Sequence, residues 1–85
     1  MVRIRKMIGD VPAYICSVEG TRIFELRTDG KVKWVRPDMA EDAADMFCDG
    51  LKISEDIREE VKYKLKEGQI PMQLMHKIFP WETNK

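Results

Sequence analysis

The stretch TRIFELRTDGKVKWVR, residues 21–36, carries the clearest structural signal in this sequence. Two runs rich in β-branched and aromatic residues flank Asp29-Gly30, a combination typical of a tight β-hairpin. A two-residue type I′ turn at this dipeptide would place Leu26 opposite Lys33. The stretch therefore predicts two antiparallel strands within a β-meander.

The residues before this hairpin extend the meander. Val2 and Ile4 alternate with arginines, as in a half-buried strand, and a β-rich run over residues 13–18 ends at Glu19-Gly20. With two-residue turns at both hairpins, one sheet face would hold Ala13, Ile15, Phe24, Leu26 and Val35. The other would hold Tyr14, Cys16, Val18, Ile23, Val32 and Trp34. A register shift of one residue would exchange these sets, and apolar residues on both faces suggest cover on both sides.

The remaining residues have the pattern of three helices. Asp38 and Ser54 are suitable N-caps, and Gly50 and Gly68 are suitable stops. Pro71 fits the first turn of a last helix that ends before Pro80. We expect a single α+β domain over residues 1–85. Its three to four strands, in residues 2–36, would pack against helices at about 38–49, 55–67 and 71–79.

A net charge of zero hides a strong segregation of charge along the chain. Residues 1–36 carry eight Lys/Arg and four Asp/Glu, whereas residues 37–50 carry five Asp/Glu and no Lys/Arg. Zero net charge argues against attraction of the whole molecule to nucleic acid. No apolar run reaches the ~20 residues of a membrane helix, and no signal peptide is evident, so we expect a cytoplasmic protein.

The stretch LKEGQIPMQLMHKIFPW, residues 65–81, resembles the centre of a helix-turn-helix because a short glycine-containing turn joins two helices. Its second helix is too apolar to favour base readout, which makes a plain αα-hairpin the better interpretation. The apolar arc of that helix spans about 200°, wider than the ~100° of an ordinary surface helix. Either the helix is buried on two sides or it contacts a partner. The predicted partner-binding residues are Met72, Met75, Phe79 and Trp81, with Trp34 on the sheet as a second candidate.

Five carboxylates gather on one side of the first expected helix. They form an acidic ridge of Asp38, Glu41, Asp42, Asp45 and Asp49. The ridge fits a basic partner, although a solvated helix face is the more frequent explanation of such a pattern. Asp49 lies at the C-terminal end, where its charge opposes the helix dipole, which suggests another use for it.

Basic residues next to an aromatic residue in the hairpin support an alternative, nucleic-acid binding. Arg27, Arg36 and Trp34 would share one predicted face, with Lys31 and Lys33 on the other. Ordinary cross-strand packing with charged edge strands accounts for the same residues.

Motifs for metal binding and catalysis are missing from the sequence. Cys16 and Cys48 are 32 residues apart and His76 is the single histidine, so a structural zinc site lacks ligands, and we expect two reduced, partly buried cysteines. Residues 45–56 match a calcium loop poorly because Phe47 replaces a ligand. No nucleophile elbow, phosphate loop or zinc-protease motif is present. We therefore expect no cofactor, no bound metal and no enzyme activity.

The expected function is binding to another protein, with a second copy of this chain as one candidate. A small regulator or inhibitor, of the kind that phages or mobile elements carry, fits this size. The alternative is a nucleic-acid-binding protein that uses the basic hairpin or the C-terminal helical pair.

Overall fold

A four-stranded antiparallel meander with strand order β1-β2-β3-β4 forms the first part of the protein. The computed structural model describes residues 2–83. Its strands are β1 (Val2–Met7), β2 (Ala13–Val18), β3 (Thr21–Arg27) and β4 (Val32–Trp34).

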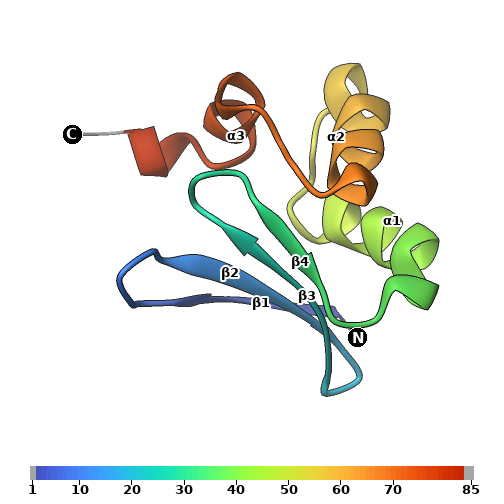
Figure 1. Cartoon of the computed structure of the whole chain (residues 1–85). Helices are drawn as coiled ribbons and strands as arrows, with labels where there is room; N and C mark the ends of the chain where they lie inside the picture. The colour runs from blue at the N-terminus through green and yellow to red at the C-terminus, as the bar shows by residue number, and fades with distance from the viewer. Residues whose placement is uncertain (1, 84–85) are drawn as a thin grey trace.

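The helices follow in the C-terminal part and lie on one side of the sheet (Figure 1). They are η1 (Pro37–Met39), α1 (Ala40–Gly50), α2 (Glu55–Glu67), α3 (Met72–Ile78) and η2 (Pro80–Thr83). The expected α+β fold is confirmed. Among the described residues, no helix has the length and apolar character needed to cross a bilayer.

Of the two predicted hairpin turns, the first is confirmed and the second is not. Val18 pairs with Thr21 across Glu19-Gly20, and both turn residues have positive φ, as a type I′ turn requires. In the β3–β4 hairpin, Leu26 pairs with Val32 instead of Lys33. The predicted two-residue turn is therefore wrong.

The longer β3–β4 turn has a local cause. The Asp29 carboxylate accepts a hydrogen bond from the Lys31 amide at 3.1 Å, which is the pattern of an Asx turn. Asp29 is not among the residues with positive φ, whereas Gly30 has φ of +96°. The Arg27 amide then donates to the Lys31 carbonyl at 2.8 Å, which leaves three residues in the loop.

An irregularity between β2 and β3 shifts the faces further. Arg22 pairs with Ser17 and Phe24 pairs with Cys16, so Ile23 is an extra residue that forms a β-bulge. Ile23 and Phe24 are consequently both buried in the core. The predicted placement of Phe24, Leu26 and Val35 with Ile15 is wrong: Phe24 and Leu26 face the helices, and Val35 lies beyond β4.

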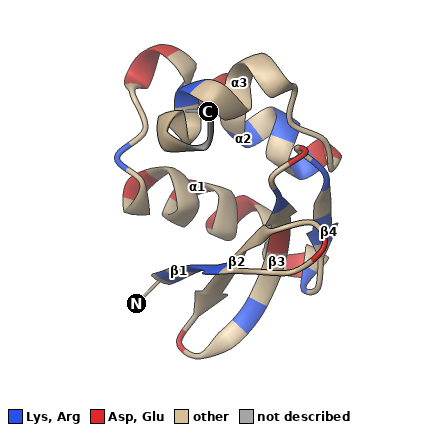
Figure 2. Cartoon of the chain, turned by 90° about the vertical axis from the view of Figure 1, so that its left-hand side faces the viewer, with Lys and Arg blue, Asp and Glu red and all other residues tan. Residues whose placement is uncertain are grey.

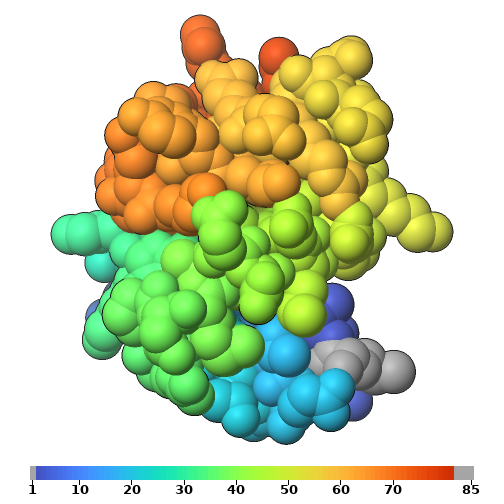
Figure 3. Space-filling model, turned by 90° about the vertical axis from the view of Figure 1, so that its right-hand side faces the viewer, coloured from blue at the N-terminus to red at the C-terminus, as the bar shows by residue number. Residues whose placement is uncertain are grey.

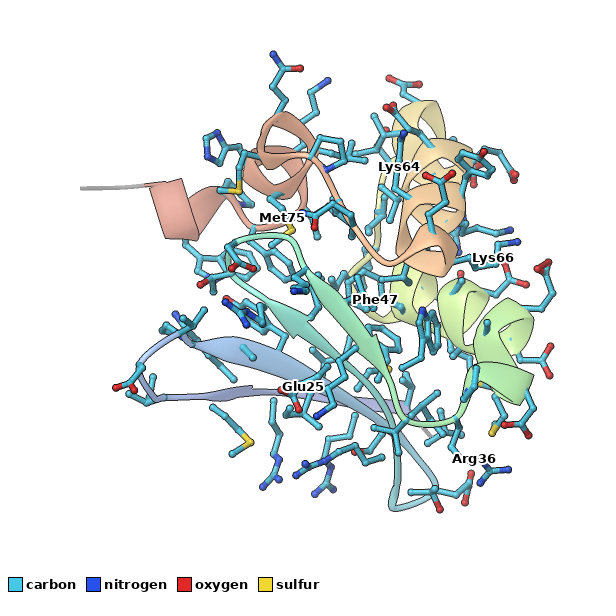
Figure 4. All side chains as sticks on the ribbon, in the orientation of Figure 1. Glu25, Arg36, Phe47, Lys64, Lys66 and Met75 are labelled. Atoms are coloured by element: carbon cyan, nitrogen blue, oxygen red, sulfur yellow. The ribbon has the colours of Figure 1, made fainter. Side chains whose placement is uncertain are left out.

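The covered face of the sheet packs against an aromatic centre. Phe47 projects from α1 toward the sheet (Figure 4), and its ring centroid lies 5.5 Å from that of Phe24 and 6.4 Å from that of Phe79. The Phe79 ring stacks on Tyr14 with centroids 4.2 Å apart. Trp34 adds a polar link, because its indole Nε1 donates to the Leu65 carbonyl at 3.1 Å. These contacts join the sheet to α1, to α2 and to the residue that follows α3.

The helix ends agree with the sequence only in part. Ser54 caps α2 by accepting a hydrogen bond from the Asp56 amide at 3.4 Å, and Gly68 ends α2 with φ of +98°. Asp38 does not cap a helix, contrary to expectation. It lies in η1 and pairs with Arg36 at 3.1 Å, which leaves α1 to begin at Ala40 without a side-chain cap.

The α2–α3 connection runs beside the β3–β4 turn. The Val32 amide donates to the Gly68 carbonyl at 2.9 Å, and the Ile70 amide donates to the Gly30 carbonyl at 2.8 Å. An isolated bridge between Lys31 and Gln69 continues this pairing. The connection therefore covers the start of β4, whereas β1 at the opposite edge has β2 as its one strand partner among residues 2–83.

Candidate interaction surfaces

Half of the predicted partner-binding surface at the last helix is buried within the domain. Met75 is 3% exposed and Phe79 is fully buried. In Figure 4, Met75 lies between α3 and the sheet. Ile70, Leu74 and Ile78 also belong to the core, so most of the wide apolar arc is buried within the domain, whereas Met72 is exposed.

Two residues of this predicted surface remain accessible. Met72 is 47% exposed and Trp81 is 58% exposed. The Trp81 Nε1 donates to the Tyr14 hydroxyl at 2.8 Å, which holds the indole edge-on to Phe79 at 5.6 Å. The third candidate, Trp34, is half-buried on the covered face. Binding of a partner here stays a prediction that now depends on Met72 and Trp81.

The acidic ridge faces basic side chains of the neighbouring helix. Figure 3 shows α1 in green beside α2 in yellow and orange, and Figure 2 shows their acidic and basic turns in red and blue. Three ion pairs form a ladder between the two helices: Glu41–Lys66, Asp45–Lys62 and Asp49–Arg58. The Asp45–Lys62 distance is 2.6 Å, and this hydrogen bond lowers the pKa of the Asp45 carboxyl. The ion pair with Arg58 compensates for the unfavourable position of the Asp49 charge at the C-terminal end of the helix.

The other two ridge carboxylates lie outside the ladder. Asp38 pairs with Arg36, whose guanidinium lowers the pKa of the Asp38 carboxyl through a hydrogen bond. Asp42 is exposed, and no ion pair is recorded for it within residues 2–83. Most of the ridge is therefore matched by cations of the chain itself, and the part left for a partner is small.

The uncovered face of the sheet carries basic residues in three cross-strand rows. The register places Arg3, Ser17 and Arg22 in one row and Arg5, Ile15, Glu25 and Lys33 in the next. A third row contains Met7, Ala13 and Arg27, with Lys31 opposite Arg27 at the turn. Glu25 is visible in Figure 4 on the side of the sheet away from the helices. We call the six cations the basic sheet face: Arg3, Arg5, Arg22, Arg27, Lys31 and Lys33.

The cations of the basic sheet face differ from those of α2 in having few acidic partners. Arg27 pairs with Asp29 at 2.8 Å. For the other five, no ion pair is recorded in the described part of the chain. Glu25 is the one acidic residue inside the three rows. The protein, although neutral as a whole, therefore presents an unbalanced positive charge on one face.

The predicted nucleic-acid group is separated by the observed register. Arg27 and Lys33 share the uncovered face with Lys31 at its rim, whereas Trp34 lies on the covered face. Arg36 lies beyond β4 and pairs with Asp38. The predicted face that combined Arg27, Arg36 and Trp34 is therefore wrong.

Three cations of this face, Arg3, Arg5 and Arg22, are absent from the residues predicted from the sequence. Arg3 and Arg5 alternate with Val2 and Ile4, so the period-2 pattern of β1 already placed them away from the core. Arg22 had no such signal, because the bulge at Ile23 breaks the alternation of β3.

Apolar residues lie at one end of the basic sheet face. Ile15 and Ala13 are buried but lie outside the core cluster between sheet and helices. They belong to a shallow hollow of about 160 Å³ that also includes the exposed side chains of Met7, Ile8 and Val11. This end of the face therefore offers apolar contact beside the cations.

The cysteines and the histidine are not brought together. Cys16 and Cys48 are buried and unpaired, and burial raises the pKa of the Cys16 thiol to about 11. His76 lies on the exposed side of α3, beside a hollow formed by residues of α2 and α3 that includes no cysteine. In the described residues, no group of three or more His, Cys, Asp or Glu side chains is arranged to hold a metal ion.

Comparisons with protein-family models, curated proteins and solved structures found no match to this chain. Among the surfaces of the described residues, the basic sheet face has the most distinctive chemistry.

Proposed function

We propose that this protein is a non-enzymatic binding protein whose basic sheet face docks onto an acidic surface of another protein. The observation that carries the proposal is the contrast between two sets of cations. Three cations of α2 form ion pairs with the acidic ridge, whereas five on the sheet form no recorded ion pair in the described chain. An acidic partner would supply the missing charge and orient the encounter.

The composition of the face favours a protein partner over nucleic acid. Four of its six cations are arginines, and exposed Met7, Ile8 and Val11 lie beside them. Arginine and methionine are enriched at protein interfaces, where lysine is depleted. The sheet's aromatic side chains face the helices, so the face lacks the stacking platform that single-stranded nucleic acid uses.

Nucleic acid remains the second candidate because of one observation. Six cations on one exposed sheet face could neutralise several phosphates. Glu25, inside this group, opposes such contacts by repelling phosphate.

A site-specific photo-crosslinker at Lys33 tests the proposal in cells that express the protein. The control places the same crosslinker at Lys77, an exposed lysine on α3 that lies outside the basic sheet face. We expect an adduct from position 33 that protease degrades and nuclease leaves intact, with an acidic segment at the crosslink. Adding Arg5→Glu and Arg22→Glu should remove that adduct. A nuclease-sensitive adduct would support nucleic acid instead, and equal adducts from both positions would refute a specific surface.

A further inference from the structure

We infer that the partner contributes an extended segment, with acidic and apolar residues alternating, which adds to the sheet along the free edge of β1. This inference rests on the proposed function and specifies how the basic sheet face recognises its partner. It is carried by three features of β1: its open backbone edge, the alternation of its side chains, and the charge on the exposed side.

The backbone of β1 is the accessible edge of the sheet. The α2–α3 connection pairs with the start of β4 through Val32, Gly68 and the Lys31–Gln69 bridge. Within residues 2–83, β1 pairs with β2 alone. In an antiparallel pair, alternate residues of an edge strand direct their N–H and C=O groups outward. β1 is six residues long, and these outward groups can accept a further strand.

The side chains of β1 determine which strand would fit. Arg3 and Arg5 project to the uncovered face, where an incoming strand would place acidic residues beside them. Val2 and Ile4 project toward the helices and are only half-buried. Their methyl groups lie 3.5 Å from the position that a side chain on Gly50 would occupy, so α1 covers them from above and leaves their outer side open. Apolar residues of the incoming strand would cover that side.

A second copy of the chain is a poor occupant of this edge. Two β1 strands paired edge to edge would bring Arg3 and Arg5 of both copies onto the same face. Like charges on neighbouring strands are destabilising, and charged edges of this kind discourage self-pairing. A strand that carries carboxylates would instead be attracted to these arginines.

Short peptides test the inference with purified full-length protein. The probe is a fluorescent eight-residue peptide in which Val and Glu alternate, with blocked ends. Two controls have the same sequence but carry N-methyl groups on every Val or on every Glu nitrogen. We expect the unmethylated peptide to bind at least tenfold more tightly than the control that has lost the amides directed at β1. Hydrogen exchange of outward β1 amides should slow on binding.

Charge variants locate the site. Arg3→Glu/Arg5→Glu should abolish binding of the unmethylated peptide, whereas Lys52→Glu/Lys77→Glu makes the same charge change outside the basic sheet face and should preserve it. Absence of peptide binding, or equal affinity for all three peptides, would overturn strand addition. The proposed function fails separately, if the crosslinker at Lys33 yields no protein adduct.

Discussion

Gly30 combines a backbone requirement with a close approach between two connections. Its φ of +96° lies in the left-handed region, and a Cβ placed there would lie 2.1 Å from the Ile70 carbonyl oxygen. The Gly30 carbonyl also accepts the Ile70 amide at 2.8 Å. One residue without a side chain therefore sets both the β3–β4 turn and the path from α2 to α3.

We expect Gly30→Ala to destabilise the protein by more than about 3 kcal/mol, since the positive φ costs roughly 1–2 kcal/mol and the clash displaces hydrogen-bonded backbone worth about 1 kcal/mol per bond. Gly20→Ala is the matched control, because Gly20 also has positive φ but no atom lies within 4 Å of its added Cβ. It should cost about 1 kcal/mol. Urea unfolding measures both. Equal losses would show that the approach to Ile70 is unimportant.

At the scale of elements, α1 and α2 are matched by charge as well as by their apolar stripes. The ladder residues of α1 are spaced four apart, as are their partners on α2, which run in the opposite order. This spacing places each set on one helix face, so an antiparallel pair brings all three pairs into contact. The acidic ridge is therefore part of the helix packing.

We expect Asp45→Lys to lower the urea midpoint, and Asp45→Lys/Lys62→Asp to restore most of the loss, because the exchange rebuilds the pair. Asp42→Lys, on the same helix outside the ladder, should have a smaller effect.

The pKa of the Asp45 carboxyl is lowered by Lys62. The stabilising effect of this ion pair is therefore present above the ordinary aspartate pKa and is lost as pH falls through the lowered value. The exchange variant should therefore still lose stability in acid, whereas Asp45→Asn should lose less there than the native protein. A midpoint for Asp45→Lys equal to that of Asp42→Lys would contradict the ladder.

For the whole molecule, the zero net charge results from two opposite excesses: residues 1–36 carry four more cations than carboxylates, and residues 37–85 carry four more carboxylates than cations. In the helical layer, three carboxylates of α1 pair with three cations of α2, while the sheet keeps its cations on an uncovered face. Only one sheet face has a helical layer, contrary to the cover on both sides that the apolar residues suggested. We propose that the cations of this face both attract an acidic partner and keep two β1 edges apart.

We expect the native protein to be monomeric at low ionic strength and Arg3→Thr/Arg5→Thr to self-associate, because the substitution leaves an uncharged, β-favouring edge strand. Arg22→Thr/Lys33→Thr removes the same charge from other strands and should stay monomeric. Sedimentation equilibrium distinguishes the species. A stable native dimer would show that these arginines do not prevent association.

Local chemistry was sufficient for the strand and helix segments, the Glu19-Gly20 turn, the Ser54 cap and the Gly68 stop. Each depends on interactions among neighbouring residues, which the order of the chain specifies directly. The distinctive charge of the first helix was also readable, although its partner on α2 was not, because that contact joins residues 9 to 25 positions apart.

Tertiary structure decided the strand register, which side chains lie on each face of the sheet, and how much of the apolar arc on α3 is buried. The extra residue at Ile23 and the longer turn at Asp29 each change the sheet by one position, and in a strand one position exchanges the buried and exposed sides. Phe79 is buried because Tyr14 and Phe47, distant in sequence, pack against its ring, and Met75 belongs to the same core cluster. Which cations remain unpaired likewise depends on contacts across the whole fold, and sequence order alone does not specify these contacts.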